Sequence, residues 1–329
     1  MQNRKTDSDI TMIIPVYNAE KYIDRCLSSL LGQSFDNFVM YLVDDGSKDS
    51  SYERLKEYQE KYPERITVFH KENGGAASAR NYALNYLDTP YVMFCDIDDY
   101  VENDFVEKLY RAITESIADM AVCAYERNGN VASDGEKGYS GVISIEDNPD
   151  FVTDVIVIVS NKIYRSDLWK KESLRFPEGV IYEDAALIPL ITARCQKIVL
   201  IDDVLYHYMD VENSVMHRQN GHEKDFFQIL DYMNQDGYRN KYPEQYQYLS
   251  MSYMFGVIIT LIRRKAKKKE YERVYQYIRK YGCNWKGNSC FERHKARSNS
   301  KGRIFHWILL KRWLWAVKLI IRLKAKKLL

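Results

Sequence analysis

Apolar strand patterns alternate with amphipathic helix patterns through the first hundred residues, and this alternation constrains the fold more than any other feature. β-Branched and apolar runs predict strands, and apolar stripes at helical spacing predict the helices between them. The strands are expected at 10–16, 38–43, 66–69 and 91–95, and the helices at 20–31, 50–62 and 76–87. Strands joined by helices of this length form βαβ units, so we expect an α/β fold with a parallel sheet.

Carboxylates follow two of these strands. Asp44 and Asp45 follow the second strand, and Asp96, Asp98 and Asp99 follow the fourth. Ligands of open parallel sheets bind outside the carboxyl ends of the strands, and like charges crowded there are costly unless a cation shares the site. Asp96 and Asp98 therefore predict a site for Mn²⁺ or Mg²⁺ that phosphate oxygens and water complete. The alternative is that the acidic residues cap the helices that follow.

A glycine-rich segment precedes the third helix. Its residues, from Asn73 to Asn81, read NGGAASARN. Gly75 and the small residues after it allow a ligand to approach the helix N-terminus, which favours anions, and Arg80 lies one turn further on. Alone the segment is weak evidence, because two glycines before a helix are usually a turn.

Four motifs in order resemble those of the family 2 glycosyltransferases: IPVYNAE from Ile14, VDDGSKD from Val43, NGG and ARN within 73–81, and DIDD from Asp96. The resemblance covers residues 10 to 102 closely and extends more loosely to 217. It implies a GT-A-type, Rossmann-like mixed sheet, largely parallel and flanked by helices. It also implies an inverting mechanism and a nucleoside diphosphate sugar, with UDP-sugar as the expected donor. The remaining chain predicts a helical C-terminal extension.

The resemblance assigns a role to each donor-side residue. Asp44 or Asp45 would bind the base or ribose, and Asp96 and Asp98 would form the D-x-D element that holds the ribose and the diphosphate-bound metal. The other expected nucleotide-sugar-binding residues are Pro15, Val16, Tyr17, Asn18, Glu20, Gly75, Arg80 and Ile97. The aromatic ring of Tyr17 suits stacking on a base, although a tyrosine packed at a strand end is the alternative.

A second set of segments, 160–164, 175–179 and 182–186, resembles the acceptor-binding half of bacterial family members. It implies that Asp184 is the catalytic base and that Asn161, Lys162 and Glu183 belong to the acceptor region. A carboxylate within hydrogen-bond reach can take the proton of a poorly nucleophilic hydroxyl, and an adjacent carboxylate raises its pKa. The alternative is an acidic pair at a helix N-terminus. Family members often have Arg at the position of Met209.

Charge is distributed unevenly, although the chain as a whole carries a formal charge of +2. From Leu261 onward there are 22 basic and 3 acidic residues. A helix over 304–325 would place Lys311, Lys318 and Arg322 on one stripe with apolar residues beside it, which is typical of a helix lying on an anionic membrane. The alternatives are packing on the acidic body or nucleic-acid binding, and the apolar content disfavours nucleic acid.

These patterns predict a nucleotide-sugar-binding half at 1–102, an acceptor-binding half at 103–221 and a basic helical region at 222–329. Six scattered cysteines are typical of a reducing compartment, and neither a signal region nor an apolar span is apparent. We therefore expect a cytoplasmic, peripheral membrane enzyme that glycosylates a saccharide hydroxyl, on a lipid-linked carrier, in surface-polysaccharide synthesis. A same-fold nucleotidyltransferase and a non-catalytic nucleotide-sugar-binding scaffold are the alternatives, and a homodimer is left open.

Overall fold

The computed structural model describes residues 8–169, 174–211, 225–235, 237–263, 265–280 and 287–297. The chain divides into two compact units, Met1–Gln219 and Asn220–Leu329, and each is described by itself.

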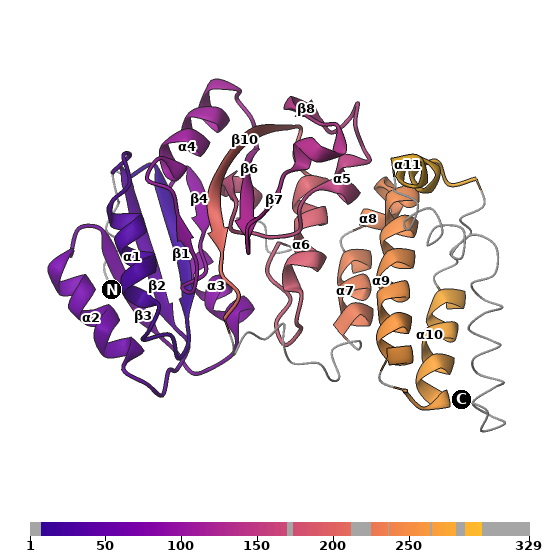
Figure 1. Ribbon diagram of the computed structural model, residues 1–329, viewed down its shortest axis with the longest axis horizontal. Helices are drawn as coiled ribbons and strands as arrows, with labels where there is room; N and C mark the ends of the chain where they lie inside the picture. Colours follow the sequence, from indigo (N-terminus) through magenta and orange to yellow (C-terminus); the bar gives the residue numbers. More distant parts are fainter. Residues whose placement is uncertain are drawn as a thin grey trace. The chain divides into compact units, whose positions relative to one another are not determined.

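The first unit is built on a sheet whose N-terminal half is parallel. Its strands, in spatial order, are β3 (Ile66–His70), β2 (Phe38–Asp44), β1 (Ile10–Val16) and β4 (Tyr91–Phe94), joined in sequence by α1 (Ile23–Leu31), α2 (Ser51–Lys61) and α3 (Ala76–Leu84). All residues of β1 and β2 are buried, as expected of central strands covered on both faces. Figure 1 shows helices on both sides of the sheet, so the predicted α/β architecture is confirmed.

The second half of this unit makes the sheet mixed. Strand β9 (Lys162–Arg165) runs antiparallel between β4 and β6 (Met120–Arg127), and β10 (Lys197–Tyr208) pairs with β6 in parallel. The remaining elements are β5 (Tyr100–Val101), α4 (Phe105–Glu115), β7 (Asn130–Ala132), η1 (Asp134–Lys137), β8 (Gly141–Ser144), α5 (Phe151–Asp154), η2 (Ser166–Leu168) and α6 (Glu183–Thr192). The largely parallel mixed sheet agrees with the prediction. Residues 128–150 contain both β7 and β8.

The two faces of the sheet are packed differently. Alternate residues of β1, including Met12 and Ile14, join α1, α2 and α4 in one aliphatic core. An aromatic cluster of Phe94, Tyr164, Trp169 and Phe176 links β4 and β9 to the segment before α6. The site therefore stands on strands that are fixed by packing on both faces.

The second unit is helical, which confirms the predicted helical extension. Helix α9 (Pro243–Arg263) packs against α7 (Asp225–Gln235), α8 (Tyr238–Lys241), α10 (Lys268–Lys280) and α11 (Ser289–Arg297). Within the described residues, no helix is long and apolar enough to cross a membrane. The predicted amphipathic helix over 304–325 lies outside them.

Candidate active site

Parallel register brings the predicted donor-side segments to one edge of the sheet. Val16, the last residue of β1, lies opposite Asp44, the last residue of β2, and Ile13 lies opposite Phe94 of β4. The N–H of Asp45 donates to the Val16 carbonyl at 2.8 Å. The strand-end motifs therefore lie at one edge of the sheet, although they are spread over eighty residues of sequence.

The loop after β1 is held to the loop after β2 by side-chain contacts. Asn18, with a left-handed φ of 48°, accepts from the Lys48 N–H at 2.7 Å, and the Glu20 carboxylate accepts from the Ser50 N–H at 3.1 Å. Pro15 and Val16 are buried within the sheet, whereas the Tyr17 side chain is exposed at this edge. Asn18 and Glu20 thus shape the backbone beside Tyr17.

The Asp45 carboxylate holds the glycine-rich loop in place. It accepts from Lys71 Nζ at 2.7 Å, from the Gly74 N–H at 3.0 Å and from the Gly75 N–H at 2.6 Å. Gly75 begins α3 at a φ of 88°, a conformation that favours glycine, and a Cβ at Gly74 would lie only 2.7 Å from Ser78 Oγ. Asp45 therefore fixes the start of α3.

Asp44 is also engaged within the protein. Its side chain is buried, and its Oδ2 lies 2.7 Å from Nδ1 of His70 at the end of β3. The assignment of base or ribose binding to Asp44 or Asp45 stays a prediction. Sequence reasoning missed His70, whose place beside Asp44 follows from the pairing of β2 with β3.

The acidic residues after β4 have unequal environments. Burial and the neighbouring Asp96 charge together raise the pKa of Asp98 to about 6. Asp99 is buried and accepts from the Tyr206 hydroxyl and from the Met209 N–H, the latter at 2.8 Å. Ile97 is buried between Asp96 and Asp98. Asp99 thus anchors β10 to the loop and is not available to a ligand.

Arg80 connects the predicted donor and acceptor residues. Its guanidinium is buried, donates to Asp96 Oδ1 at 2.6 Å and to Glu183 Oε1 at 2.7 Å, and lies over the Phe176 ring. Although burial lowers the pKa of Arg80, the carboxylates of Asp96, Asp184 and Glu183 raise it on balance. Arg80 therefore carries a permanent positive charge between the two halves of the site.

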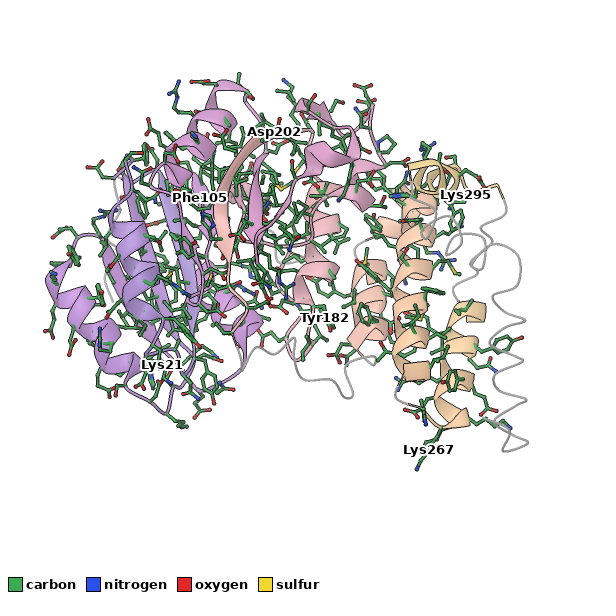
Figure 2. The ribbon with its side chains drawn as sticks, viewed as in Figure 1. Lys21, Phe105, Tyr182, Asp202, Lys267 and Lys295 are labelled. Atoms are coloured by element: carbon green, nitrogen blue, oxygen red, sulfur yellow. The ribbon has the colours of Figure 1, made fainter. Side chains whose placement is uncertain are left out.

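Asp184 lies at the start of α6, next to Glu183. Tyr182, which precedes the pair and is labelled in Figure 2, has a left-handed φ of 69° that turns the chain into the helix. Asp184 Oδ2 accepts from the Val159 N–H at 3.0 Å, whereas its Oδ1 is buried without a hydrogen-bond partner among the described residues. Burial, together with the Glu183 and Asp96 charges, outweighs the opposing Arg80 charge and raises the pKa of Asp184 to about 7.

Asn161 and Lys162 are fully buried. Lys162 Nζ donates to the carbonyls of Ile156 and Ile158 at 2.8 and 2.7 Å and to Asn161 Oδ1 at 2.6 Å. Ser160, which sequence reasoning did not select, donates to Asp96 Oδ2 at 3.4 Å. The start of β9 therefore contacts both Asp96 and, through Val159, Asp184.

Comparison with known proteins supports the family that the motifs indicate. Residues 11–171 match the model of Glycosyl transferase family 2. The chain is 36% identical over 215 residues to Glycosyltransferase GlyA of Streptococcus pneumoniae serotype 4, a match that covers 61% of this chain and 30% of that protein. It is 30% identical over 217 residues to the Minor teichoic acid biosynthesis protein GgaB of Bacillus subtilis, covering 63% of this chain and 24% of that protein. Residues 11–171 of this chain form a family 2 glycosyltransferase domain.

A solved structure supports the GT-A-type fold. S. aureus TarS 1-349 in complex with UDP-GlcNAc aligns with a TM-score of 0.61 at 20% identity, over 88% of this chain and 91% of that one. The chain spans less than a third of the length of GlyA and GgaB, at 30% and 24%. The likeness to TarS shows the fold alone, and the predicted GT-A class is confirmed.

Asp96 and Asp98, the predicted D-x-D carboxylates, fit a cation that would be shared with a diphosphate. No group of three His, Cys, Asp or Glu side chains within the described residues could enclose a metal. Mg²⁺ and Mn²⁺ sites of this kind need only one or two carboxylates, because phosphate oxygens and water supply the rest. Asp98 fits this requirement, since a bound cation would favour the ionised form that its burial disfavours.

Proposed function

We propose that this chain is an inverting glycosyltransferase that moves a sugar from a nucleoside diphosphate donor, a UDP-sugar, to a saccharide hydroxyl. The observation that carries the proposal is the unpartnered, buried Oδ1 of Asp184. A buried polar atom without a partner costs about 1–3 kcal/mol, so its retention beside the other predicted site residues is best explained by a ligand that donates to it.

Asp184 is suited to accept a proton from the acceptor. A general base is most effective when its pKa lies near the working pH, and the pKa of Asp184 is raised to about 7. As the acceptor oxygen bonds to the sugar's anomeric carbon, Asp184 takes the hydroxyl proton and the nucleoside diphosphate leaves from the opposite face. The product then has the inverted anomeric configuration.

The donor would occupy the edge of the sheet between Tyr17 and the D-x-D loop. The exposed ring of Tyr17 offers a stacking surface for the base. Asp96 and Asp98 would hold Mn²⁺ or Mg²⁺, which when bound offsets negative charge on the diphosphate. The UDP-GlcNAc complex of TarS supports a uridine donor.

The acceptor class rests on the relatives. GgaB is named as a teichoic acid biosynthesis protein, and another relative, 29% identical over 208 residues, as a poly(ribitol-phosphate) beta-glucosyltransferase. We infer that this chain likewise acts in cell-surface polysaccharide synthesis, on a lipid-linked saccharide. Asn161 and Lys162 would support the acceptor side from within the protein, because both are buried, and Glu183 would do so through Arg80.

Replacing Asp184 by Asn tests this function. Removal of a general base costs about 10²–10⁴-fold in rate, so sugar transfer should fall by about 10³-fold while UDP and Mn²⁺ still bind. The assay is release of free nucleotide from a panel of nucleotide sugars with a saccharide acceptor, alongside calorimetric titration with UDP. Unchanged turnover would remove Asp184 from the mechanism, and simultaneous loss of UDP binding would make its role structural.

We further propose that the helical unit contacts an anionic membrane at the inner face of the cell. The predicted contact over 304–325 lies outside the described residues. The turn between α9 and α10 and the start of α10 support the same partner, because Lys265, Lys267 and Lys269 are exposed there and Ile262, near the end of α9, is 49% exposed. Figure 2 shows Lys267 projecting from this turn. Near an anionic bilayer each lysine contributes about 1 kcal/mol.

Liposome sedimentation separates these two contacts. Deleting 304–329 should abolish sedimentation with phosphatidylglycerol vesicles, whereas replacing Lys265, Lys267 and Lys269 by Gln should weaken binding to them by about 100-fold. Vesicles of neutral phosphatidylcholine are the control. Full sedimentation of the truncated protein would show that 304–325 is not the membrane helix, and full sedimentation of the triple variant would exclude the turn.

A further inference from the structure

A lysine lies in the protein interior next to the proposed active site. Lys162 is the first residue of β9, and its side chain is fully buried. Burial lowers the pKa of Lys162 more than the Asp134 charge raises it, which leaves the pKa at about 8. Since burying an ammonium group is costly and lysine is rarely found without solvent contact, its three hydrogen bonds must provide a compensating benefit.

Two of these hydrogen bonds hold the segment that contacts Asp184. Lys162 Nζ donates to the Ile158 carbonyl at 2.7 Å and to the Ile156 carbonyl at 2.8 Å. The Ile158 carbonyl and the Val159 N–H belong to the same planar peptide group, and that N–H donates to Asp184 Oδ2 at 3.0 Å. A single rigid unit therefore connects the lysine to the carboxylate.

The rest of the segment is fixed on both sides of this peptide. The Tyr164 hydroxyl donates to the Val159 carbonyl at 3.1 Å, and the Ile156 N–H donates to Asp134 Oδ1 at 2.9 Å. The 158–159 peptide therefore cannot rotate without breaking the contact with Lys162. A positive charge at the carbonyl end also polarises the peptide, which strengthens the N–H as a donor.

We propose that Lys162 is a positioning residue for Asp184, acting through the Ile158–Val159 peptide. An ammonium group has three donors, and all three are used within the protein, so Lys162 does not bind the acceptor itself. It fixes Asp184 Oδ2 on the Val159 N–H, which leaves Oδ1 to face the acceptor hydroxyl. This inference rests on the proposed role of Asp184 as general base.

Replacing Lys162 by Met removes the ammonium group and keeps the length of the side chain. Misplacement of a reacting group by about 1 Å costs about 10²-fold in rate, so kcat should fall by about 30- to 100-fold while the KM for the donor stays within about twofold. Because the Val159 N–H lowers the pKa of Asp184, weakening that bond should also shift the acid limb of the kcat/KM profile to higher pH.

Gln33→Met is the matched control for a loss of stability alone. Gln33 is also buried, and its Nε2 donates to the carbonyls of Ser29 and Glu102 at 2.9 and 2.7 Å. Both variants should lower the melting temperature, and only Lys162→Met should change kcat and the pH profile. Equal effects of the two variants on kcat would overturn the proposal. Lys162→Gln, with an expected fall of about fivefold, carries the test if Lys162→Met does not fold.

A double substitution distinguishes failure of this inference from failure of the proposed function. In an Asp184→Asn background, Lys162→Met should reduce the residual turnover by less than about twofold, because the two residues act as one unit. A full 30-fold effect in that background would show that Lys162 acts elsewhere. If Asp184→Asn alone leaves turnover unchanged, the base assignment itself is wrong, whatever Lys162 does.

Discussion

Two groups of carboxylates in the site differ in how their oxygens are used. The first is represented by Asp45, after β2, and the second by Asp98, after β4, and Asp184, at the start of α6. Asp45 is buried, and its two oxygens accept from an ammonium group and two backbone N–H groups. Asp184 accepts one backbone N–H and keeps a second, buried oxygen without a partner among the described residues. Asp98 is half-buried, and its ionisation is opposed by burial and by Asp96.

This difference separates carboxylates that build the site from carboxylates that are available to a ligand. A buried charge with full hydrogen bonding stabilises the backbone around it, whereas a poorly paired one lowers the stability of the fold. Such a cost is usual where a group must meet its ligand without first breaking another bond. Substituting Asp45 should therefore lower mainly the folding stability, whereas substituting Asp98 should lower mainly the activity.

Asp98→Asn should have the largest effect. Loss of the charge that would hold the diphosphate cation should reduce transfer by about 10³-fold, with little loss of folding stability, because the charge is poorly solvated in the free protein. The measurement is nucleotide release over a Mn²⁺ titration. Asp203→Asn, whose carboxylate pairs with Lys108 at the surface, is the control and should remain within about twofold. Wild-type turnover in Asp98→Asn would exclude Asp98 from the metal site.

Asp45→Asn should mainly lower the folding stability. It leaves Lys71 without its partner and weakens the contacts with Gly74 and Gly75, so the free energy of unfolding should fall by about 3 kcal/mol. Urea denaturation measures this change. The Lys71→Met, Asp45→Asn double variant should recover part of the loss, since no charge is then left unpaired. An unchanged midpoint would show that Asp45 does not stabilise the loop.

The sequence predicted those features of the site that depend on local residue patterns, and not those that depend on contacts between distant residues. Strand β1 was predicted at 10–16 to the residue, because burial on both faces gives a continuous apolar run with sharp ends. Local motifs also placed Asp96 and Asp98 after a strand and Gly75 before a helix, as the structure has them. The contact of Arg80 with Glu183 joins residues 103 positions apart, and no local pattern encodes it.

Burial of polar residues was the part that sequence could not supply. Lys162 was assigned to the acceptor region, but a lysine next to Asn161 gives no sign that both side chains lie in the interior. Asp99 has the same residue type as Asp98, and only the pairing of β10 with β5 brings Tyr206 and Met209 to it. The division between structural and available carboxylates thus depends on tertiary contacts.

The smallest expected effect is on folding stability, and it tests directly whether the hydrogen-bonded and the unpaired carboxylates differ. Asp184→Asn should be more stable than the unmodified protein above neutral pH. The pKa of Asp184 is raised from 3.8 to about 7 in the folded state, so the folded protein binds more protons than the unfolded chain between these values. Stability from the protonated form is therefore complete below about pH 4 and is lost as pH rises to about 7. Asn does not titrate, so the difference in unfolding free energy should grow by about 2 kcal/mol from pH 5 to pH 8 in favour of the variant.

Urea denaturation at both pH values measures it, with Gln33→Met as a control whose difference from the unmodified protein should not depend on pH. A variant that is less stable than the unmodified protein at pH 8 would mean that the ionised Asp184 is well solvated or paired, and the distinction between the two groups of carboxylates would not hold.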